Sequence, residues 1–187
     1  NKLYRVDGRV YELGQHGFAR DMDFVKMEGS DTEVLYRLES DEETLRKYPW
    51  PFRLEIGYRL KGNTLDVIWK VYNPGEEDMY FQIGAHPAFN YPDYDPDKAE
   101  RGCFSFDRTE GLECIRIKEK GCVDAVTRYP LELREDGFLP LSRDTFDVID
   151  TLMLQDSQIS RVTLHRNDGT PWLTLNFAAP VVGLWSP

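Results

Sequence analysis

The sequence has no apolar run that approaches the length of a membrane span and no segment like the apolar core of a signal peptide. Basic residues are in the minority: 23 lysines and arginines stand against 33 acidic residues, for a formal net charge of -10. Such a surface repels nucleic-acid phosphates and anionic lipid headgroups. The sequence therefore disfavours nucleic acid and membranes as partners, although solubility alone also explains the acidity.

Cysteine is scarce and shows no paired spacing. Cys103, Cys114 and Cys122 form an odd set without a Cys-x-x-Cys pair, so we expect no disulfide framework. Free thiols are typical of reducing compartments, and we predict a cytoplasmic protein.

Several common catalytic motifs are missing as well. The sequence has neither the Gly-x-Ser-x-Gly elbow of a serine hydrolase nor a glycine-rich phosphate loop. A metal site in a β protein favours closely spaced ligands, whereas the three histidines, His16, His86 and His165, are far apart in sequence. We therefore predict no metal site.

Strand-like alternation is present along nearly the whole chain. The content is 41% hydrophobic and 13% aromatic, which argues against disorder, and 187 residues suffice for a sizeable core. Apolar and polar residues alternate over residues 52–60 and 65–71, and Asp7-Gly8 has the composition of a tight hairpin turn. We predict an all-β antiparallel fold, a sandwich or a barrel, in one domain spanning residues 1–187.

Other elements follow from shorter patterns. Strands are expected at residues 3–6, 10–13, 79–83, 103–106, 113–117, 161–165, 171–177 and 181–185. Short helical turns are expected at residues 41–47 and 142–147, with Ser40 and Ser142 as caps. Residues 90–101, rich in proline and aspartate, are expected to form a loop.

The most informative motif is His86-Pro87, which follows the strand-like run 79–83. A residue before proline is excluded from the helical region, so we expect His86 to be extended at a strand end. An imidazole fixed there could act as an acid or a base. A histidine hydrogen-bonded in a plain turn is the alternative, and the motif alone leaves both open.

A second turn carries His16, followed by Gly17 and Arg20. Glycine lets the backbone approach a ligand closely, and the guanidinium offers a planar set of donors to hydroxyl or anionic oxygens. Ordinary loop composition explains the same residues. His165 alternates like a plain strand residue and is assigned no role. The aromatic residues could form a sugar-stacking floor, although a core role is the commoner one; they are Trp50, Trp69, Phe89, Tyr91 and Trp185.

Taken together, these segments resemble the aldose 1-epimerase (galactose mutarotase-like) family, and most closely its bacterial branch associated with lactose operons. The resemblance runs over essentially the whole chain. The matching segments are residues 13–21, 48–52, 80–90 and 182–186, which include His-Gly and His-Pro-Ala-Phe-Asn.

The resemblance implies a β-sandwich of the mutarotase type and cofactor-free interconversion of the α and β anomers of an aldohexose. It implies that His86 is the general acid and that His16 holds and polarises the same region of the sugar. Arg20, Asn90 and Asp150 are the expected substrate-binding residues.

The chain also departs from the family pattern. The family's general base is a glutamate in a strand just beyond the Trp-Ser segment, and an arginine lies upstream of the first hairpin; neither has a counterpart in residues 1–187. We expect the chain to be the central part of a longer member. Two other functions remain open: a hexose-6-phosphate 1-epimerase, which would need a cluster of basic residues, and a non-catalytic sugar-binding or regulatory module.

Overall fold

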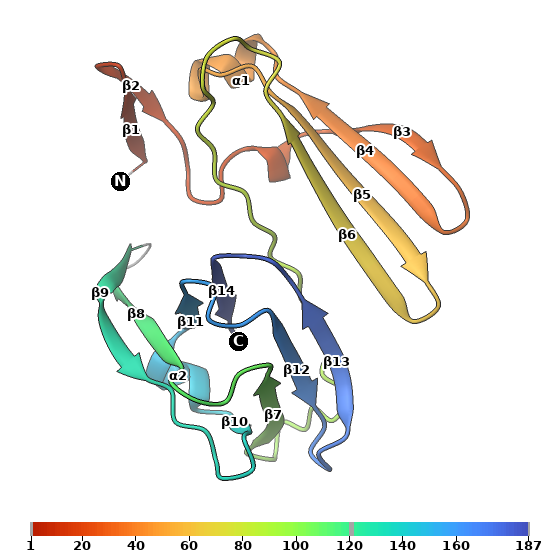
Figure 1. Ribbon diagram of the computed structural model, residues 1–187, viewed down its shortest axis with the longest axis vertical. Helices are drawn as coiled ribbons and strands as arrows, with labels where there is room; N and C mark the ends of the chain where they lie inside the picture. Colours follow the sequence, from red (N-terminus) through yellow and green to blue (C-terminus); the bar gives the residue numbers. More distant parts are fainter. Residues whose placement is uncertain (1, 120–121, 187) are drawn as a thin grey trace. The chain divides into compact units, whose positions relative to one another are not determined.

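The structure, a computed structural model, describes residues 2–119 and 122–186 and is built almost entirely of antiparallel β-strands (Figure 1). Its contacts divide into two compact units, residues 1–85 and residues 86–187. Across the described ranges, no helix is both long enough and apolar enough to cross a bilayer.

The first unit begins with a hairpin of β1 (Leu3–Val6) and β2 (Arg9–Glu12). Its two turn residues, Asp7 and Gly8, have φ angles of 47° and 79°. Left-handed conformations at both positions match the twist of the flanking strands, which is why Asp-Gly favours this turn. The predicted hairpin is confirmed.

The first unit continues with a four-stranded antiparallel sheet in the order β3-β4-β5-β6. The strands are β3 (Val25–Gly29), β4 (Glu33–Glu39), β5 (Arg53–Lys61) and β6 (Thr64–Tyr72). Leu38 of β4 pairs with Leu54 of β5, and both are buried on one face. On the other face, the Arg37 guanidinium donates to Glu55 Oε1 over 2.8 Å. The alternation predicted for β5 and β6 therefore separates an apolar face from a charged one.

A single-turn helix, α1 (Glu42–Lys47), connects β4 to β5, and a short 3-10 helix, η1 (Ala19–Asp21), precedes β3. The helix predicted at 41–47 is confirmed, but its predicted cap is wrong. Asp41 is the cap, because its carboxylate accepts the Thr44 N–H while the Thr44 hydroxyl accepts the Asp41 N–H, both over 2.8 Å. The Ser40 hydroxyl instead accepts the Phe52 N–H.

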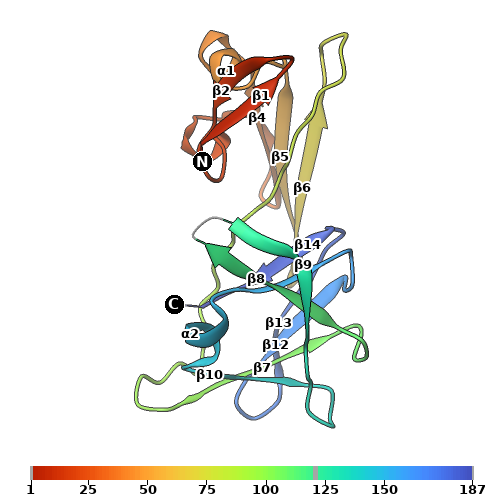
Figure 2. The same ribbon diagram turned by 90° about the vertical axis from the view of Figure 1, so that its left-hand side faces the viewer.

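The second unit is a sandwich of two antiparallel sheets, ordered β10-β7-β12-β13 and β14-β11-β8-β9 (Figures 1 and 2). The first sheet contains β7 (Glu100–Phe106), β10 (Leu139–Ser142), β12 (Arg161–His165) and β13 (Pro171–Asn176). The second contains β8 (Glu113–Glu119), β9 (Cys122–Pro130), β11 (Leu152–Gln155) and β14 (Val181–Leu184). Phe106 and Val162 from one sheet share a core with Leu152 and Leu154 from the other.

The all-β antiparallel prediction is confirmed, and so are the strands expected near residues 103–106, 113–117, 161–165, 171–177 and 181–185. The sequence patterns do not predict β3, β4, β9, β10 or β11. The second helix is α2 (Thr145–Ile149), which begins later than expected. Ser142 is not its cap: it ends β10, where its N–H and hydroxyl both contact the Thr145 hydroxyl.

The strand predicted at residues 79–83 is wrong, and so is the placement of His86 at a strand end. The backbone from Met79 to Asn90 lies in no strand, and residues 80–90 are all exposed. Tyr80 is 70% exposed and Phe81 is 51% exposed. A strand needs hydrogen-bond partners for its backbone, and the described sheets do not include this segment.

Candidate functional site

The turn that carries His16 has an unusual backbone. The Gly17 N–H donates to the Gly14 carbonyl over 3.1 Å, which closes a tight turn. His16 has a φ angle of 69° and Gly17 one of 67°. Positive φ is uncommon for a residue with a Cβ, and such backbone is concentrated at functional sites. Asp7, in a plain hairpin turn, also has a positive φ, so the role of the His16 turn stays a prediction.

Aromatic packing fixes this turn to the first unit's core. The Phe18 ring lies 5.7 Å from the Phe52 ring and 6.2 Å from the Tyr48 ring, measured between centroids. Phe18 and Ala19 both pack against the core cluster of Leu38, Phe52 and Leu54. The His16 side chain is exposed, so the backbone beneath it is anchored while the imidazole faces outward.

A hollow of about 1060 Å³ borders the same turn. Gly14 and Gly17 line it, together with Arg37 of β4 and Asp41 of the α1 cap. Its remaining charged lining is mainly acidic: Glu12, Asp21, Asp23, Glu39 and Glu43 stand against Lys2 and Lys47. A smaller hollow, about 290 Å³, lies over Gly57 and does not include the turn.

Arg20 lies in η1, four residues after His16, with its side chain 63% exposed. Its Nε lies 3.5 Å from an oxygen of Asp21, itself 71% exposed. An ion pair this open to water contributes little to stability. Arg20 is therefore able to turn its donors toward a ligand at little cost.

The segment that leads to His86 is held at Tyr80. The Tyr48 hydroxyl donates to the Tyr80 carbonyl over 2.8 Å, and the Trp50 ring meets the Tyr80 ring edge-on at 5.8 Å. Burial, and to a smaller extent the neighbouring Tyr4, raises the pKa of Tyr48 to about 12, so its hydroxyl remains a donor at neutral pH. The exposed run 80–90 therefore begins at an anchored residue.

Three predicted residues lie in the second unit. His86 and Asn90 share one exposed loop, and the Asn90 carbonyl accepts the Trp172 indole N–H over 3.3 Å. Asp150 follows α2 and is exposed, with a φ angle of 59°, and its Oδ1 accepts the Thr151 hydroxyl over 3.0 Å. In the first unit, His16 lies in the Gly14–Gly17 turn and Arg20 in η1, four residues later. All five roles remain predictions.

The aromatic candidates do not behave as one set. Trp69, Phe89 and Trp185 are 40%, 51% and 54% exposed, so the core role favoured for the set is wrong for these three. Trp50 and Tyr91 are half-buried. A role as a sugar-stacking floor stays a prediction for all of them.

Sequence reasoning assigned His165 no role, and the structure gives it a buried one. His165 is 7% exposed, its Nε2 lies 2.8 Å from the Ser105 hydroxyl, and its Nδ1 lies 3.0 Å from the Gly169 carbonyl. An N–H on Nδ1 donates to that carbonyl, which leaves Nε2 to accept from Ser105. The Phe138 ring meets this imidazole edge-on at 4.9 Å. The hydrogen bonds of His165 with Ser105 and with Gly169 together connect β7 to the β12–β13 hairpin.

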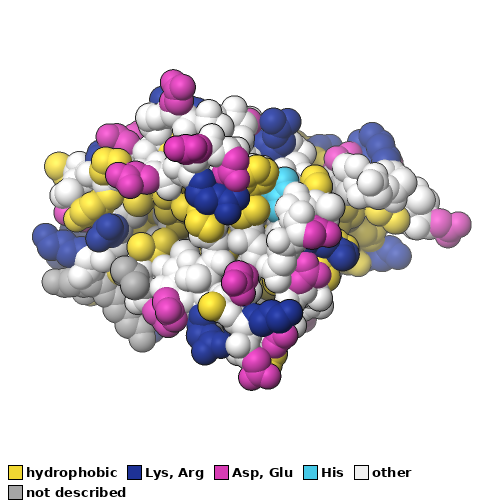
Figure 3. Space-filling model, turned by 90° about the horizontal axis from the view of Figure 1, so that it is seen from below, with side chains coloured by type: hydrophobic (Ala, Val, Ile, Leu, Met, Phe, Trp, Pro, Cys, Tyr) yellow, Lys and Arg dark blue, Asp and Glu magenta, His cyan; other side chains and the backbone are white. Residues whose placement is uncertain are grey.

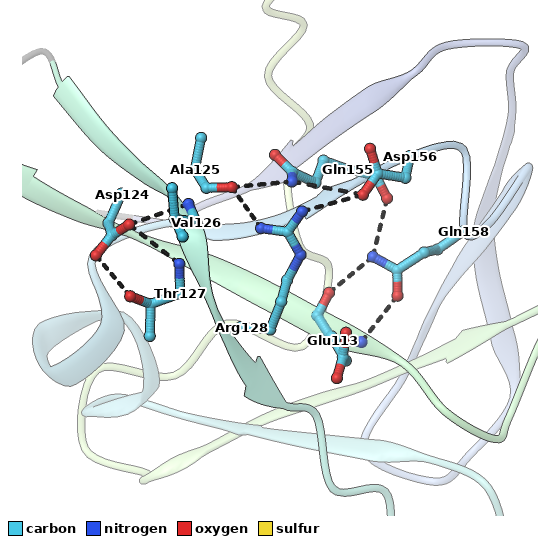
Figure 4. Close-up of polar contacts among 9 residues, drawn as sticks. All are labelled: Glu113, Asp124, Ala125, Val126, Thr127, Arg128, Gln155, Asp156 and Gln158. Carbon is cyan, nitrogen blue, oxygen red and sulfur yellow. Dashed lines mark hydrogen bonds and ion pairs between the residues drawn. The ribbon is translucent and has the colours of Figure 1, made fainter.

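A polar network on β9 was also missed (Figure 4). The Asp124 carboxylate accepts the N–H groups of Val126 and Thr127 and the Thr127 hydroxyl, which lowers its pKa to about 2. The Arg128 guanidinium donates to the Ala125 carbonyl and to Asp156. These bonds hold a bulge in β9, the edge strand of its sheet, and a bulged edge resists pairing with other chains. The network therefore accounts for the shape of β9 and does not suggest a catalytic or binding role.

Charges are mixed where the surface is visible in Figure 3. On that face, acidic and basic side chains lie interspersed among patches of apolar surface. The excess of acidic residues in the sequence is therefore not collected into one acidic area on that side.

Comparisons with known proteins give a consistent result. Residues 1–178 match the family model described as aldose 1-epimerase. The chain is 30% identical over 190 residues to the chromosomal protein LacX of Lactococcus lactis subsp. lactis, an alignment that covers 98% of this chain and 63% of LacX.

Solved structures give the same picture. A galactose mutarotase related enzyme from Lactobacillus acidophilus is 30% identical, with a TM-score of 0.83, over 99% of this chain and 61% of that one. A galactose mutarotase-like protein from Lactobacillus casei ATCC 334 is 29% identical, with a TM-score of 0.86, over 100% of this chain and 63% of that one. The chain thus spans less than two thirds of the length of each of these relatives.

Proposed function

This chain belongs to the aldose 1-epimerase family, and we propose that it serves the interconversion of the α and β anomers of an aldohexose. The observation that carries the proposal is the family match over residues 1–178, which spans both histidine turns. The related galactose mutarotase-like structures support the same class of reaction. No cofactor enters the proposed chemistry.

The reaction requires two proton transfers at one sugar. A general acid gives a proton to the ring oxygen as its bond to C1 breaks, while a general base takes the proton from the C1 hydroxyl, which becomes the aldehyde carbonyl. Rotation about C1–C2 presents the other face of the aldehyde, and the ring closes with both proton transfers reversed. A positioned acid or base contributes roughly 10²–10⁴-fold to the rate.

His86 is assigned the acid in this scheme. Its ring nitrogen releases a proton to the sugar in ring opening and recovers one in ring closure, a role that an imidazole can fill because its nitrogens both donate and accept protons. His16 is assigned to the same region of the sugar, where it polarises the oxygen that is protonated. The anchored backbone beneath each turn supports these roles, because misplaced catalytic groups lose rate steeply.

Arg20, Asn90 and Asp150 are assigned to the sugar hydroxyls. An exposed guanidinium donates to hydroxyl oxygens, an exposed carboxylate accepts from hydroxyl groups, and an amide does both. We assign no general base within residues 1–187. The activity therefore has to be measured on the full-length product of the gene that encodes them.

Polarimetry on that product tests the proposal. Freshly dissolved α-glucose and α-galactose should reach their anomeric equilibrium faster with the protein than in buffer alone. The same assay with α-glucose 6-phosphate separates the two epimerase classes, since a phosphosugar enzyme would accelerate only that substrate. Saturable sugar binding without any acceleration would replace the enzyme with a binding module.

A further inference from the structure

The loop that carries His86 is exposed, yet the residues immediately after it are held by a distant part of the chain. Asn90, Tyr91 and Asp93 contact Arg166, Asn167 and Trp172, which lie at or beside the turn between β12 and β13. We call these six residues the hairpin clamp. All of them belong to the second unit, as does His86.

The first contact of the clamp is the indole of Trp172. Its Nε1 donates to the Asn90 carbonyl over 3.3 Å, so it fixes the backbone four residues after His86. The Arg166 guanidinium lies over the indole ring, 4.9 Å from its centroid. A cation at this distance from a tryptophan face is attracted to it, which restrains the indole plane.

The second contact is the Tyr91 hydroxyl, which donates to Asn167 Oδ1 over 3.0 Å and lies 3.4 Å from the His165 carbonyl. Burial, and next the Asp93 carboxylate, raises the pKa of Tyr91, so the hydroxyl stays protonated. Its ring end rests against Gly102, where a Cβ would overlap both the Tyr91 hydroxyl and the His165 carbonyl. Glycine at φ 76° makes room for this contact.

The third contact is the Asp93 carboxylate. It accepts the Asn167 N–H over 3.1 Å and lies 3.9 Å from the Arg166 guanidinium. The clamp therefore holds three residues of the loop through a backbone carbonyl, a hydroxyl and a carboxylate. The contacts share Asn167, which binds both Tyr91 and Asp93, and together they restrain the chain from Asn90 to Asp93, just after the His86-Pro87 turn.

A proton donor must be held in a narrow range of positions, because a displacement of about 1 Å can cost about 10²-fold in rate. We propose that the hairpin clamp positions the His86 imidazole, with Tyr91 and Trp172 as positioning residues that do not themselves contact the sugar. This inference rests on the proposed function, since it assigns the clamp to the acid of that reaction.

Two substitutions test the clamp, each with a minimal change. Tyr91→Phe removes only the hydroxyl, and Trp172→Phe removes the indole N–H. Tyr94→Phe is the matched control: it lies on the same loop, it is 64% exposed, and its hydroxyl makes no hydrogen bond with the described residues. Each clamp substitution should lower kcat about fivefold to tenfold with KM within about twofold, while the control stays at the parent value.

A spectroscopic readout separates the clamp from the proposed function. Residues 1–187 contain three histidines, and His→Gln variants of the full-length product assign the imidazole NMR signals of His86, His16 and His165 individually. Tyr91→Phe and Trp172→Phe should both move or broaden the His86 signal, and Tyr94→Phe should not.

The outcomes divide cleanly. A His86 signal and a kcat that match the Tyr94→Phe control in both clamp variants would overturn the inference. Clamp variants in which KM rises by the same factor as kcat falls would also overturn the inference, because a rise in KM indicates that a contact with the sugar has been lost. If the parent protein shows no mutarotation, the proposed function fails, while a shifted His86 signal still supports the clamp.

Discussion

Gly102→Ala is the substitution for which the structure allows the most detailed prediction. Gly102 lies in β7 at φ 76°, a backbone conformation that costs an alanine about 1–2 kcal/mol. The added Cβ would also overlap the His165 carbonyl oxygen and the Tyr91 hydroxyl. The carbonyl belongs to the adjacent strand β12, so it cannot rotate away as a flexible side chain would. Overpacking of this kind typically costs a further ~1–3 kcal/mol.

The net expectation for Gly102→Ala is a loss of about 1–5 kcal/mol in the free energy of unfolding. The backbone and overpacking terms are partly offset by about 0.4–1 kcal/mol, because alanine restricts the unfolded chain. Urea unfolding followed by tryptophan fluorescence measures the change. A shift in the midpoint without a change in slope would identify it as a loss of stability.

Two other glycines separate the causes. Gly169 has φ 83°, and no atom lies within 4 Å of the position that a Cβ would take, so Gly169→Ala carries the backbone cost alone, about 1 kcal/mol. Gly14 has open space and no positive φ, and Gly14→Ala should change stability by less than about 0.5 kcal/mol. The reasoning is refuted if Gly102→Ala is no more destabilising than Gly169→Ala.

Two further predictions concern the second unit. Leu152 is 2% exposed, so Leu152→Ala should lower the free energy of unfolding, measured by urea titration, by about 2–5 kcal/mol. Val126 is 87% exposed, so Val126→Ala should leave the free energy of unfolding unchanged. Equal effects of the two substitutions would contradict the assigned core. In the folded protein the pKa of Asp124 is about 2, below its usual 3.8. The ionised carboxylate therefore contributes fully to the free energy of unfolding above about pH 4, and this contribution is lost as the pH falls toward 2. Asp124→Asn should therefore flatten stability against pH in that interval, and an unchanged acid limb would count against the β9 network.

Local sequence was sufficient to predict the hairpins and much of the sheet. Asp7-Gly8 turns the chain as expected, because both residues accept positive φ where the turn needs it. Apolar alternation likewise predicts the strands β5 and β6, but their apolar face is buried only at one end: Leu54 is 9% exposed, whereas Leu65 and Val67 are 57% and 47% exposed. These features depend on neighbours within a few residues.

The failures depend on partners far away in sequence. Residues 79–83 have the composition of a strand, but a strand forms only where another supplies its hydrogen bonds. The bulge in β9 is an exception, because the Asp124 side chain satisfies backbone groups only two and three residues away, at Val126 and Thr127. His165 alternates like a plain strand residue and is assigned no role from the sequence, but it is buried and its ring hydrogen-bonds the Ser105 hydroxyl on the adjacent strand, 60 residues away in sequence.

The candidate site shows the same division. The turns of His16 and His86 could be identified from motifs and from a family resemblance, because each is a short contiguous segment. The clamp could not, since Tyr91 and Asn167 are 76 residues apart and neither stands in a recognisable motif. A structure is needed to show that a hairpin holds the loop beside a candidate acid.

The most direct test of the account is the rate of mutarotation after His86→Ala in the full-length product. The parent protein should accelerate the mutarotation of α-glucose or α-galactose, and His86→Ala should reduce kcat by at least about 100-fold. Gln82→Ala, on the same exposed segment, should retain the parent rate. A parent protein that leaves the rate of mutarotation unchanged, or a His86→Ala variant as active as the parent, would contradict the account.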